Sequence, residues 1–170
     1  MVMPVHEKPK KRNLIIDVGA GEGGFAAFLR SRNPQREVIG IDRDSKAKGI
    51  VPESMGEFFA KMSPEQAERM HAVWLNHVQL TSTEAHMELR QLAQKLPQGV
   101  PAILTIRKKN LLPVTNSIEA AGLKVVGQAP YSPRMIGSEF TKKYYEESKR
   151  NPCEAPIRLV AMKPPLKKKN

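Results

Sequence analysis

The sequence predicts an α/β fold of the Rossmann-like class, with a mostly parallel sheet, helices on both faces and an antiparallel C-terminal hairpin. Three observations lead to this class. Short apolar runs alternate with segments of helical spacing, a glycine-rich turn follows the first run, and two late runs lack a packing helix between them. The 170 residues, 40% of them hydrophobic, suffice for one domain with one buried core.

The first β-α-β unit is the clearest part of this pattern. Residues 13–18 read NLIIDV, an apolar run with β-branched residues that is typical of a buried parallel strand. Apolar residues at helical spacing follow the glycine turn, and Asn33-Pro34 ends the helix that they predict. Residues 38–41 form a second apolar strand, which ends at Asp42.

The middle of the chain predicts shorter elements. A strand or turn is expected around residues 57–59, in a segment without a strong period. Ser63 has the position of a helix N-cap, and Gln66 completes a capping box three residues later. The apolar segment 72–80 then predicts another buried strand.

The rest of the chain continues the alternation of helix and strand. Thr81 and Glu84 are expected to form a capping box that opens a helix. The remaining predicted elements are a strand at 100–106, a helix at 113–121 closed by Gly122, a strand at 123–128, a polar helix at about 138–150 and a strand at 157–162.

The charge of the chain is strongly basic and unevenly distributed. Twenty-eight Lys and Arg face 17 Asp and Glu, which gives a formal net charge of +11. An excess of this size attracts polyanions such as nucleic acid, although basic tails that only aid solubility are the plainer alternative. We expect basic flexible tails at 1–12 and 164–170 around a domain at 13–163, with an insertion at 133–156 before the last strand.

Several classes of protein are disfavoured. A single cysteine, Cys153, cannot form an intrachain disulfide, and four scattered histidines make a poor metal site. No stretch approaches the ~20 apolar residues that cross a bilayer, and the first residues lack the apolar core of a secretory signal. We therefore expect a cytoplasmic monomer or homodimer with no membrane contact.

The glycine turn after the first strand carries the strongest functional signal. Gly19, Gly21 and Gly23 allow the backbone to approach a ligand closely, and Asp42 can accept hydrogen bonds from ribose hydroxyls. S-adenosylmethionine and a nicotinamide dinucleotide both fit such a turn. Asp17 favours S-adenosylmethionine, because its carboxylate would lie near the cofactor's amino group but would repel a pyrophosphate. A tight turn without a ligand is the alternative.

The segment IIDVGAGEGGF, followed by VIGIDRD, resembles the first two motifs of class I S-adenosylmethionine-dependent methyltransferases. It is similar in particular to the tRNA (guanine-N7)-methyltransferase family, whose aromatic-Leu-Asn segment is matched by Trp74-Leu75-Asn76. The Ser/Thr and Glu that open that family's insertion are resembled by residues 137–141. The resemblance implies methyl transfer to RNA, with tRNA as substrate and guanine N7 as acceptor.

The chain also departs from that family. His77-Val78-Gln79 stand where the family has Phe-Pro-Asp-Pro-Trp, and Thr141 stands where it has a second acid. A different methylated atom is therefore an open alternative. So are a protein or small-molecule methyltransferase and an inactive nucleic-acid-binding protein that has kept the fold.

Two residues at the end of the predicted fourth strand are the catalytic candidates. The amide of Asn76 can donate and accept hydrogen bonds, and the imidazole of His77 can act as a base or stack on a substrate. Structural roles at a strand end are the alternative for both. Glu57 is expected to bind the cofactor's adenine amino group if a third strand ends there. The expected substrate contacts are Asn76, Arg107, Lys108, Ser138, Glu139 and Thr141.

Overall fold

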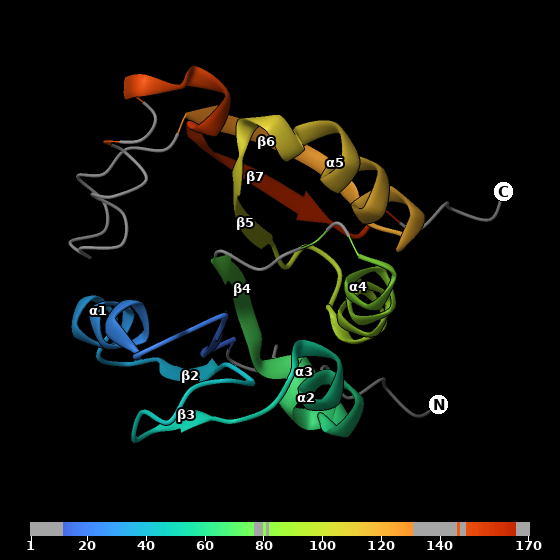
Figure 1. Ribbon diagram of the computed structural model, residues 1–170. Coiled ribbons are helices and arrows are strands. Elements are labelled where there is room, and N and C mark those ends of the chain that lie inside the picture. The colour runs from blue at the N-terminus through green and yellow to red at the C-terminus, as the bar shows by residue number, and fades with distance from the viewer. Residues whose placement is uncertain (1–11, 77–79, 81, 131–145, 147–148, 166–170) are drawn as a thin grey trace, which may run out of the picture.

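The computed structural model of the protein describes residues 12–76, 80, 82–130, 146 and 149–165 (Figure 1). Within this part of the chain, seven strands form a single sheet. The strands are β1 (Leu14–Val18), β2 (Glu37–Ile41), β3 (Ile50–Val51), β4 (Met70–Asn76), β5 (Ala102–Arg107), β6 (Lys124–Pro130) and β7 (Pro156–Met162).

The order of the strands confirms the predicted fold class. It runs β3-β2-β1-β4-β5-β7-β6, and β1 to β5 pair in parallel. Strand β7 runs antiparallel to both β5 and β6, so it lies inside the sheet and leaves β6 at the edge. The predicted antiparallel pair of the last two strands is therefore present. Strand β7 is the one that pairs with the parallel part of the sheet, through β5.

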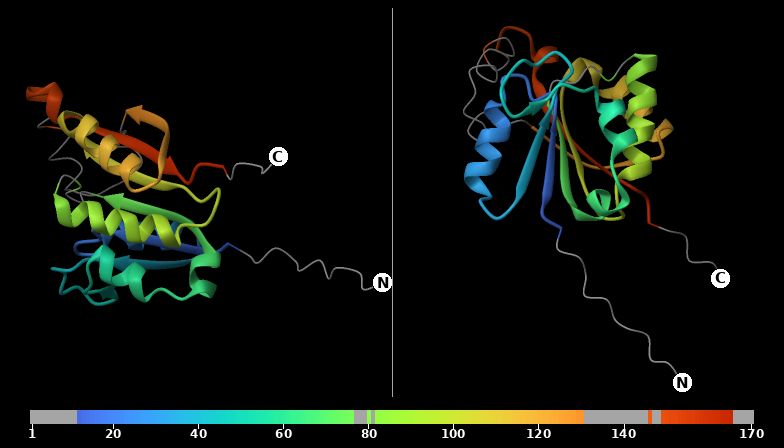
Figure 2. Two further views of the ribbon diagram at one scale, coloured as in Figure 1. Left: turned by 90° about the vertical axis from the view of Figure 1, so that its right-hand side faces the viewer. Right: turned by 90° about the horizontal axis from the view of Figure 1, so that it is seen from below.

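Helices cover both faces of the sheet. Helix α1 lies on one face, and α2, α4 and α5 lie on the other (Figure 2). The helices are α1 (Gly24–Arg32), α2 (Met55–Lys61), α3 (Pro64–Arg69), α4 (Thr83–Lys95) and α5 (Leu111–Ala120), with 3-10 turns η1 (Lys108–Asn110) and η3 (Pro152–Glu154).

Burial in the hydrophobic core explains why β1 is a strand and α4 an amphipathic helix. All five residues of β1 are buried, as expected for a central strand that has helices on both faces. The apolar residues of α4 that share one face, Leu89, Leu92 and Ala93, are buried against the sheet. Burying one such leucine contributes about 1.5–3 kcal/mol to folding.

Two local predictions were wrong, and in both cases a serine cap explains the difference. Residues 57–59 belong to α2, because Ser54 accepts a hydrogen bond from the Glu57 backbone while the Glu57 carboxylate accepts one from the Ser54 backbone. Helix α4 is capped by Ser82, whose hydroxyl accepts from the Ala85 N–H, in place of the predicted Thr81–Glu84 box. Thr81 itself lies outside the described residues.

One other cap is as predicted, whereas the predicted strand at 72–80 has different ends. The capping box of Ser63 and Gln66 is present at the start of α3. Strand β4 begins two residues before its predicted start and ends at Asn76. Of the predicted helix at 138–150, residues 146, 149 and 150 are described, and they are helical.

Candidate functional site

The glycine turn joins β1 to α1 at the carboxyl edge of the parallel strands. Gly19, Gly21 and Gly23 have φ angles of +73°, +52° and +82°, in the region that side-chain-bearing residues rarely adopt. The N–H groups of Gly19 and Ala20 donate to the Ile41 carbonyl at 2.9 and 3.1 Å, which holds the turn against the end of β2. A Cβ at Gly21 would meet no atom within 4 Å, so the turn faces open space there.

Asp42 connects this turn to the loop that follows β2. Its Oδ2 accepts a hydrogen bond from the Gly21 N–H at 2.9 Å, and its Oδ1 accepts one from the Asp44 N–H at 3.0 Å. The Ser45 hydroxyl donates to the Gly21 carbonyl at 2.6 Å. Each carboxylate oxygen can accept a further hydrogen bond, so Asp42 can shape the turn and still bind a ligand.

A pocket of about 180 Å³ opens at the carboxyl ends of β1, β2 and β3. Four carboxylates and one guanidinium are among the groups that line it, and the guanidinium of Arg43 is bound by Glu84 at 2.8 Å. The pocket is therefore an acidic one within a strongly basic protein. Its lining residues are Val18, Gly19, Ile41, Asp42, Arg43, Asp44, Glu53, Ser54, Met55 and Glu88.

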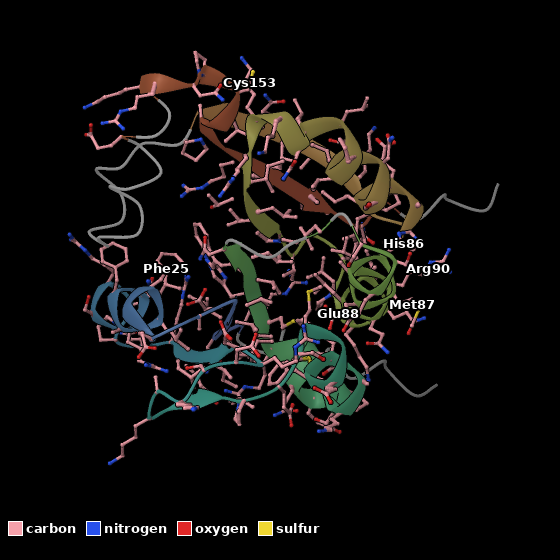
Figure 3. The ribbon with its side chains drawn as sticks, in the orientation of Figure 1. Phe25, His86, Met87, Glu88, Arg90 and Cys153 are labelled. Carbon is pink, nitrogen blue, oxygen red and sulfur yellow. The ribbon has the colours of Figure 1, made fainter. Side chains whose placement is uncertain are left out.

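Helices α2 and α4 and the loop before α2 also line the pocket, through residues other than Glu57. Glu88 lies on the side of α4 that faces α2 (Figure 3), where its Oε1 accepts a hydrogen bond from the Gly56 N–H at 3.2 Å. Glu53 follows β3 and binds Lys61 at 2.8 Å. Glu57 does not line the pocket, and hydrogen bonds from Ser54 hold the pKa of its exposed carboxyl below the ordinary value. The strand end on which its predicted adenine role depended is absent.

A chain of buried polar side chains crosses three strands beside the turn. The Asn76 Nδ2 donates to Asp17 Oδ1 at 3.1 Å, and the Thr105 hydroxyl donates to Asn76 Oδ1 at 3.1 Å. All three side chains are buried. The register of the parallel strands explains the arrangement, because Asn76 lies directly beside Thr105 and two residues beyond the partner of Asp17.

Asp17 is the most unusual member of this chain. It is fully buried, and its Oδ2 has no hydrogen-bond partner among the described residues. Burial raises the pKa of Asp17 to about 7, although the Asn76 hydrogen bond and the charge of Arg30 act in the opposite direction. A buried carboxyl with an unsatisfied oxygen can bind a cation or an N–H donor that enters the site.

An aromatic stack lies on the same side of the sheet. The Phe25 ring meets Trp74 edge-on, with 5.2 Å between their centroids. The Arg158 guanidinium lies 5.0 Å from the centre of the Trp74 ring. Because Arg158 pairs in register with Thr105, the stack connects α1 to β7 beside the buried polar chain.

The predicted site residues separate into three groups. Asp17, the glycines, Asp42 and Asn76 lie together at the carboxyl edge, where Arg107 and Lys108 also end β5 and begin η1. Glu57 lies apart from them. His77, Ser138, Glu139 and Thr141 lie outside the described residues.

Four residues of the site were not predicted from the sequence: Asp44, Glu53, Glu88 and Thr105. For Thr105 a signal existed, since it lies near the carboxyl end of the strand that follows Asn76. Neither a group of side chains suited to a metal ion nor a helix able to span a membrane occurs in the part of the chain that the structure describes.

The fold of this chain is similar to that of several solved methyltransferases. No family model matches the chain. The 16S rRNA methyltransferase KamB is similar with a TM-score of 0.62 and 17% identity over 91% of this chain and 90% of KamB. The aminoglycoside resistance methyltransferase NpmB1 gives 0.61 and 17% over 91% and 88%.

A third similar structure has another kind of substrate. The O-methyltransferase NcsB1 from neocarzinostatin biosynthesis, solved with S-adenosylmethionine and 2-hydroxy-5-methyl naphthoic acid, has a TM-score of 0.61 and 14% identity. The likeness covers 90% of this chain and 49% of NcsB1. At these identities the likeness establishes the fold, and the reaction must be argued from the site.

Proposed function

We propose that this protein is an S-adenosylmethionine-dependent methyltransferase that acts on RNA. The observation that carries the proposal is the acidic pocket beside the glycine turn, together with the unsatisfied carboxyl of Asp17. Both features favour a nucleoside that carries positive charge and no phosphate.

The charges of the pocket argue against a dinucleotide. Carboxylates at Asp42, Asp44, Glu53 and Glu88 line it, and the single guanidinium is already paired with Glu84. A pyrophosphate bound in this pocket would bring negative charge close to these carboxylates. Like charges repel more strongly in a partly buried site than in water. A sulfonium and an ammonium group would be attracted.

The cofactor's parts can be assigned to residues of this chain. Asp42 would accept hydrogen bonds from the ribose hydroxyls, the turn at 19–23 would lie against the cofactor, and Asp17 would bind its amino group. Glu53 and Glu88 replace Glu57 as candidates for the adenine amino group. When bound, the cofactor supplies an activated methyl group.

Asn76 is the residue that we assign to the acceptor side. Its amide oxygen and one of its N–H bonds are held by Thr105 and Asp17, which fixes the side chain and leaves one N–H for a substrate. A fixed donor aids methyl transfer by holding the acceptor in line. The catalytic role of His77 and the substrate contacts of Ser138, Glu139 and Thr141 stay predictions.

The net charge of +11 favours RNA as the substrate, and Arg107 and Lys108 lie at the edge where phosphates would approach. Transfer to tRNA at guanine N7 stays a prediction from the sequence resemblance, and a place in the cytoplasm stays a prediction from composition. KamB is named as a 16S rRNA methyltransferase, so ribosomal RNA must be tested beside tRNA.

A small-molecule substrate, as in NcsB1, is the competing candidate. The proposed division of the chain is a domain at 13–163 between basic tails.

Two measurements test the proposal. In calorimetry, S-adenosylhomocysteine should bind and a nicotinamide dinucleotide should not; the reverse result would overturn the cofactor assignment. Purified protein is then incubated with methyl-labelled S-adenosylmethionine and separate tRNA, ribosomal RNA, protein and metabolite fractions. Label in either RNA fraction supports the proposal, whereas label in protein or metabolites alone contradicts it. Cofactor and RNA binding without transfer would identify an inactive relative.

A further inference from the structure

The topology of the sheet brings two basic segments of the chain to the edge opposite the cofactor pocket. Arg12 lies just before β1, at the amino edge of the parallel strands. Because β7 runs antiparallel to β5, it ends at that same edge, and Lys163 follows it directly (Figure 2). The sequence continues from these residues into Lys8, Lys10 and Lys11 on one side and Lys167, Lys168 and Lys169 on the other.

Gln98 holds the two segments together. The Arg12 guanidinium donates to the Gln98 carbonyl at 3.1 Å. The Gln98 side-chain amide donates to the carbonyls of Lys163 and Pro164 at 3.1 and 3.0 Å. The Lys163 ammonium group donates to the Gln94 carbonyl at 3.2 Å. Arg12 and Lys163 are therefore both held by the end of α4 and the loop that joins it to β5.

Two more residues extend this cluster along the edge. Arg36 immediately precedes β2, and His71 is the second residue of β4. Burial lowers the pKa of His71, and the positive charges of Arg36 and Arg12 lower it further. Both guanidinium groups are thus close enough to act on one imidazole. We call Arg12, Arg36, His71 and Lys163 the amino-edge cluster.

The described part of the chain does not neutralise the cluster. Among the residues that the structure describes, no carboxylate forms an ion pair with Arg12, Arg36 or Lys163. Glu37, the acid next to Arg36, is bound by Arg69. Unpaired cations that gather at one edge repel each other, so they destabilise the free protein unless a polyanion offsets their charge.

We propose that the amino-edge cluster is a second RNA-contact surface, which binds phosphates of the RNA at a distance from the methylated nucleotide. The inference rests on the proposed RNA substrate. Strands of five to seven residues at ~3.3 Å per residue separate the two edges by about 16–23 Å, so the contacted phosphates must belong to other nucleotides. The exposed apolar side chains among the described residues, Met87, Leu112 and Val126, are not part of the cluster, which gives it no means of inserting into a bilayer.

A pair of charge-matched variants tests this surface. The double variant Arg36→Gln/Lys163→Gln removes two charges from the amino edge. The control Lys48→Gln/Arg90→Gln removes two exposed charges elsewhere, and Figure 3 shows Arg90 on the side of α4 that faces away from α2. Thermal unfolding of both variants verifies that they fold. Binding of unfractionated tRNA and of ribosomal RNA is measured without cofactor over a range of salt concentrations.

We expect the amino-edge variant to bind RNA about fivefold to tenfold more weakly, and the slope of log affinity against log salt to decrease by about 1.4, for two phosphates at ~0.7 each. Affinity for S-adenosylhomocysteine should not change. Equal effects of the two double variants would overturn the proposal, as would equally strong binding of the wild type to phosphatidylglycerol vesicles. Because RNA binding is measured without cofactor, its outcome does not depend on whether the protein transfers a methyl group. The two proposals can therefore fail independently.

Discussion

The pocket at the carboxyl edge and the amino-edge cluster have opposite charge, although the same strands build both edges of the sheet. At the carboxyl edge, acids follow β2 and β3 and line the pocket. At the amino edge, cations precede β1 and β2 and follow β7. Helices α1, α3 and α4 add to this separation, since each carries a basic residue in its last turn and each is followed by the start of a strand.

This separation shows that the net charge of a protein does not describe its binding site. A value of +11 suggests a cationic active site, whereas the pocket itself is acidic. An acidic pocket suits a cationic nucleoside, and basic groups outside it suit the phosphates of a large substrate. If the division is functional, substitutions at one edge should leave the ligand of the other edge unaffected.

The largest expected effect is at Asp42. Replacing Asp42 by Ala removes the proposed ribose ligand and also the acceptor for the Gly21 and Asp44 N–H groups. We expect S-adenosylhomocysteine to bind about 10- to 100-fold more weakly, in line with ~1.5–3 kcal/mol for a charged hydrogen bond. Asp44→Ala is the matched comparison, because it removes another carboxylate of the pocket but keeps the backbone N–H that Asp44 donates to Asp42. Calorimetry in which both variants behave alike would remove the ribose assignment.

A smaller effect should appear in the pH dependence of Asp17. With a pKa of about 7, this carboxyl is mostly protonated in the free protein at pH 5.5 and becomes charged above pH 7. Its neutral form stabilises the free fold at low pH, and this contribution is lost as the pH rises from about 4 through 7. Affinity for the cationic cofactor should instead rise by about tenfold between pH 5.5 and 7.5, because the charged form binds a cation.

Asp17→Asn is the variant that tests this interpretation. It keeps the shape of the side chain and its contact with Asn76 but cannot become charged. The slope of cofactor affinity against pH should therefore flatten in calorimetric titrations. An unchanged slope in this variant would show that another group titrates.

The smallest expected effects separate Glu88 from Glu57. Glu88→Gln should weaken S-adenosylhomocysteine binding by about threefold to tenfold, as expected for one hydrogen bond of ~1 kcal/mol. Glu57→Gln should leave that affinity unchanged and lower the unfolding free energy by no more than about 0.5–1 kcal/mol, since it only alters a helix cap. Calorimetry and chemical denaturation measure the two outcomes. A loss of affinity in Glu57→Gln would instead restore the original assignment.

The sequence was sufficient where one local signal determines the structure. The apolar run of β1, the glycines after it and the acid that ends β2 are all read within a few neighbouring residues, and the fold class followed from them. The capping box of Ser63 and Gln66 is equally local. The box of Ser54 and Glu57 has the same spacing, but Pro52 and Gly56 around it resemble a loop, so α2 was missed.

The rest of the site depends on relations between distant segments. Thr105 meets Asn76 because two parallel strands share a register that neither strand encodes alone. Glu88 enters the pocket because α4 packs on α2, and its sequence context is that of an ordinary amphipathic helix. The charge of the amino edge is also invisible in sequence. Arg12 and Arg36 become neighbours through the pairing of β1 with β2, and Lys163 reaches the same edge only because β7 is antiparallel to β5.

Gly56, whose N–H binds Glu88, has a consequence for how the pocket can change. A Cβ at this position would lie 3.0 Å from the Glu88 Cγ and 2.6 Å from the Gln91 side-chain oxygen. The amide of Gln91 can rotate away, but Glu88 would have to move by a few tenths of an ångström. One added methyl group, on a helix outside every recognised motif, would thus reposition a carboxylate that lines the pocket. Variation at residue 56 among relatives would be a sensitive marker of altered nucleoside preference.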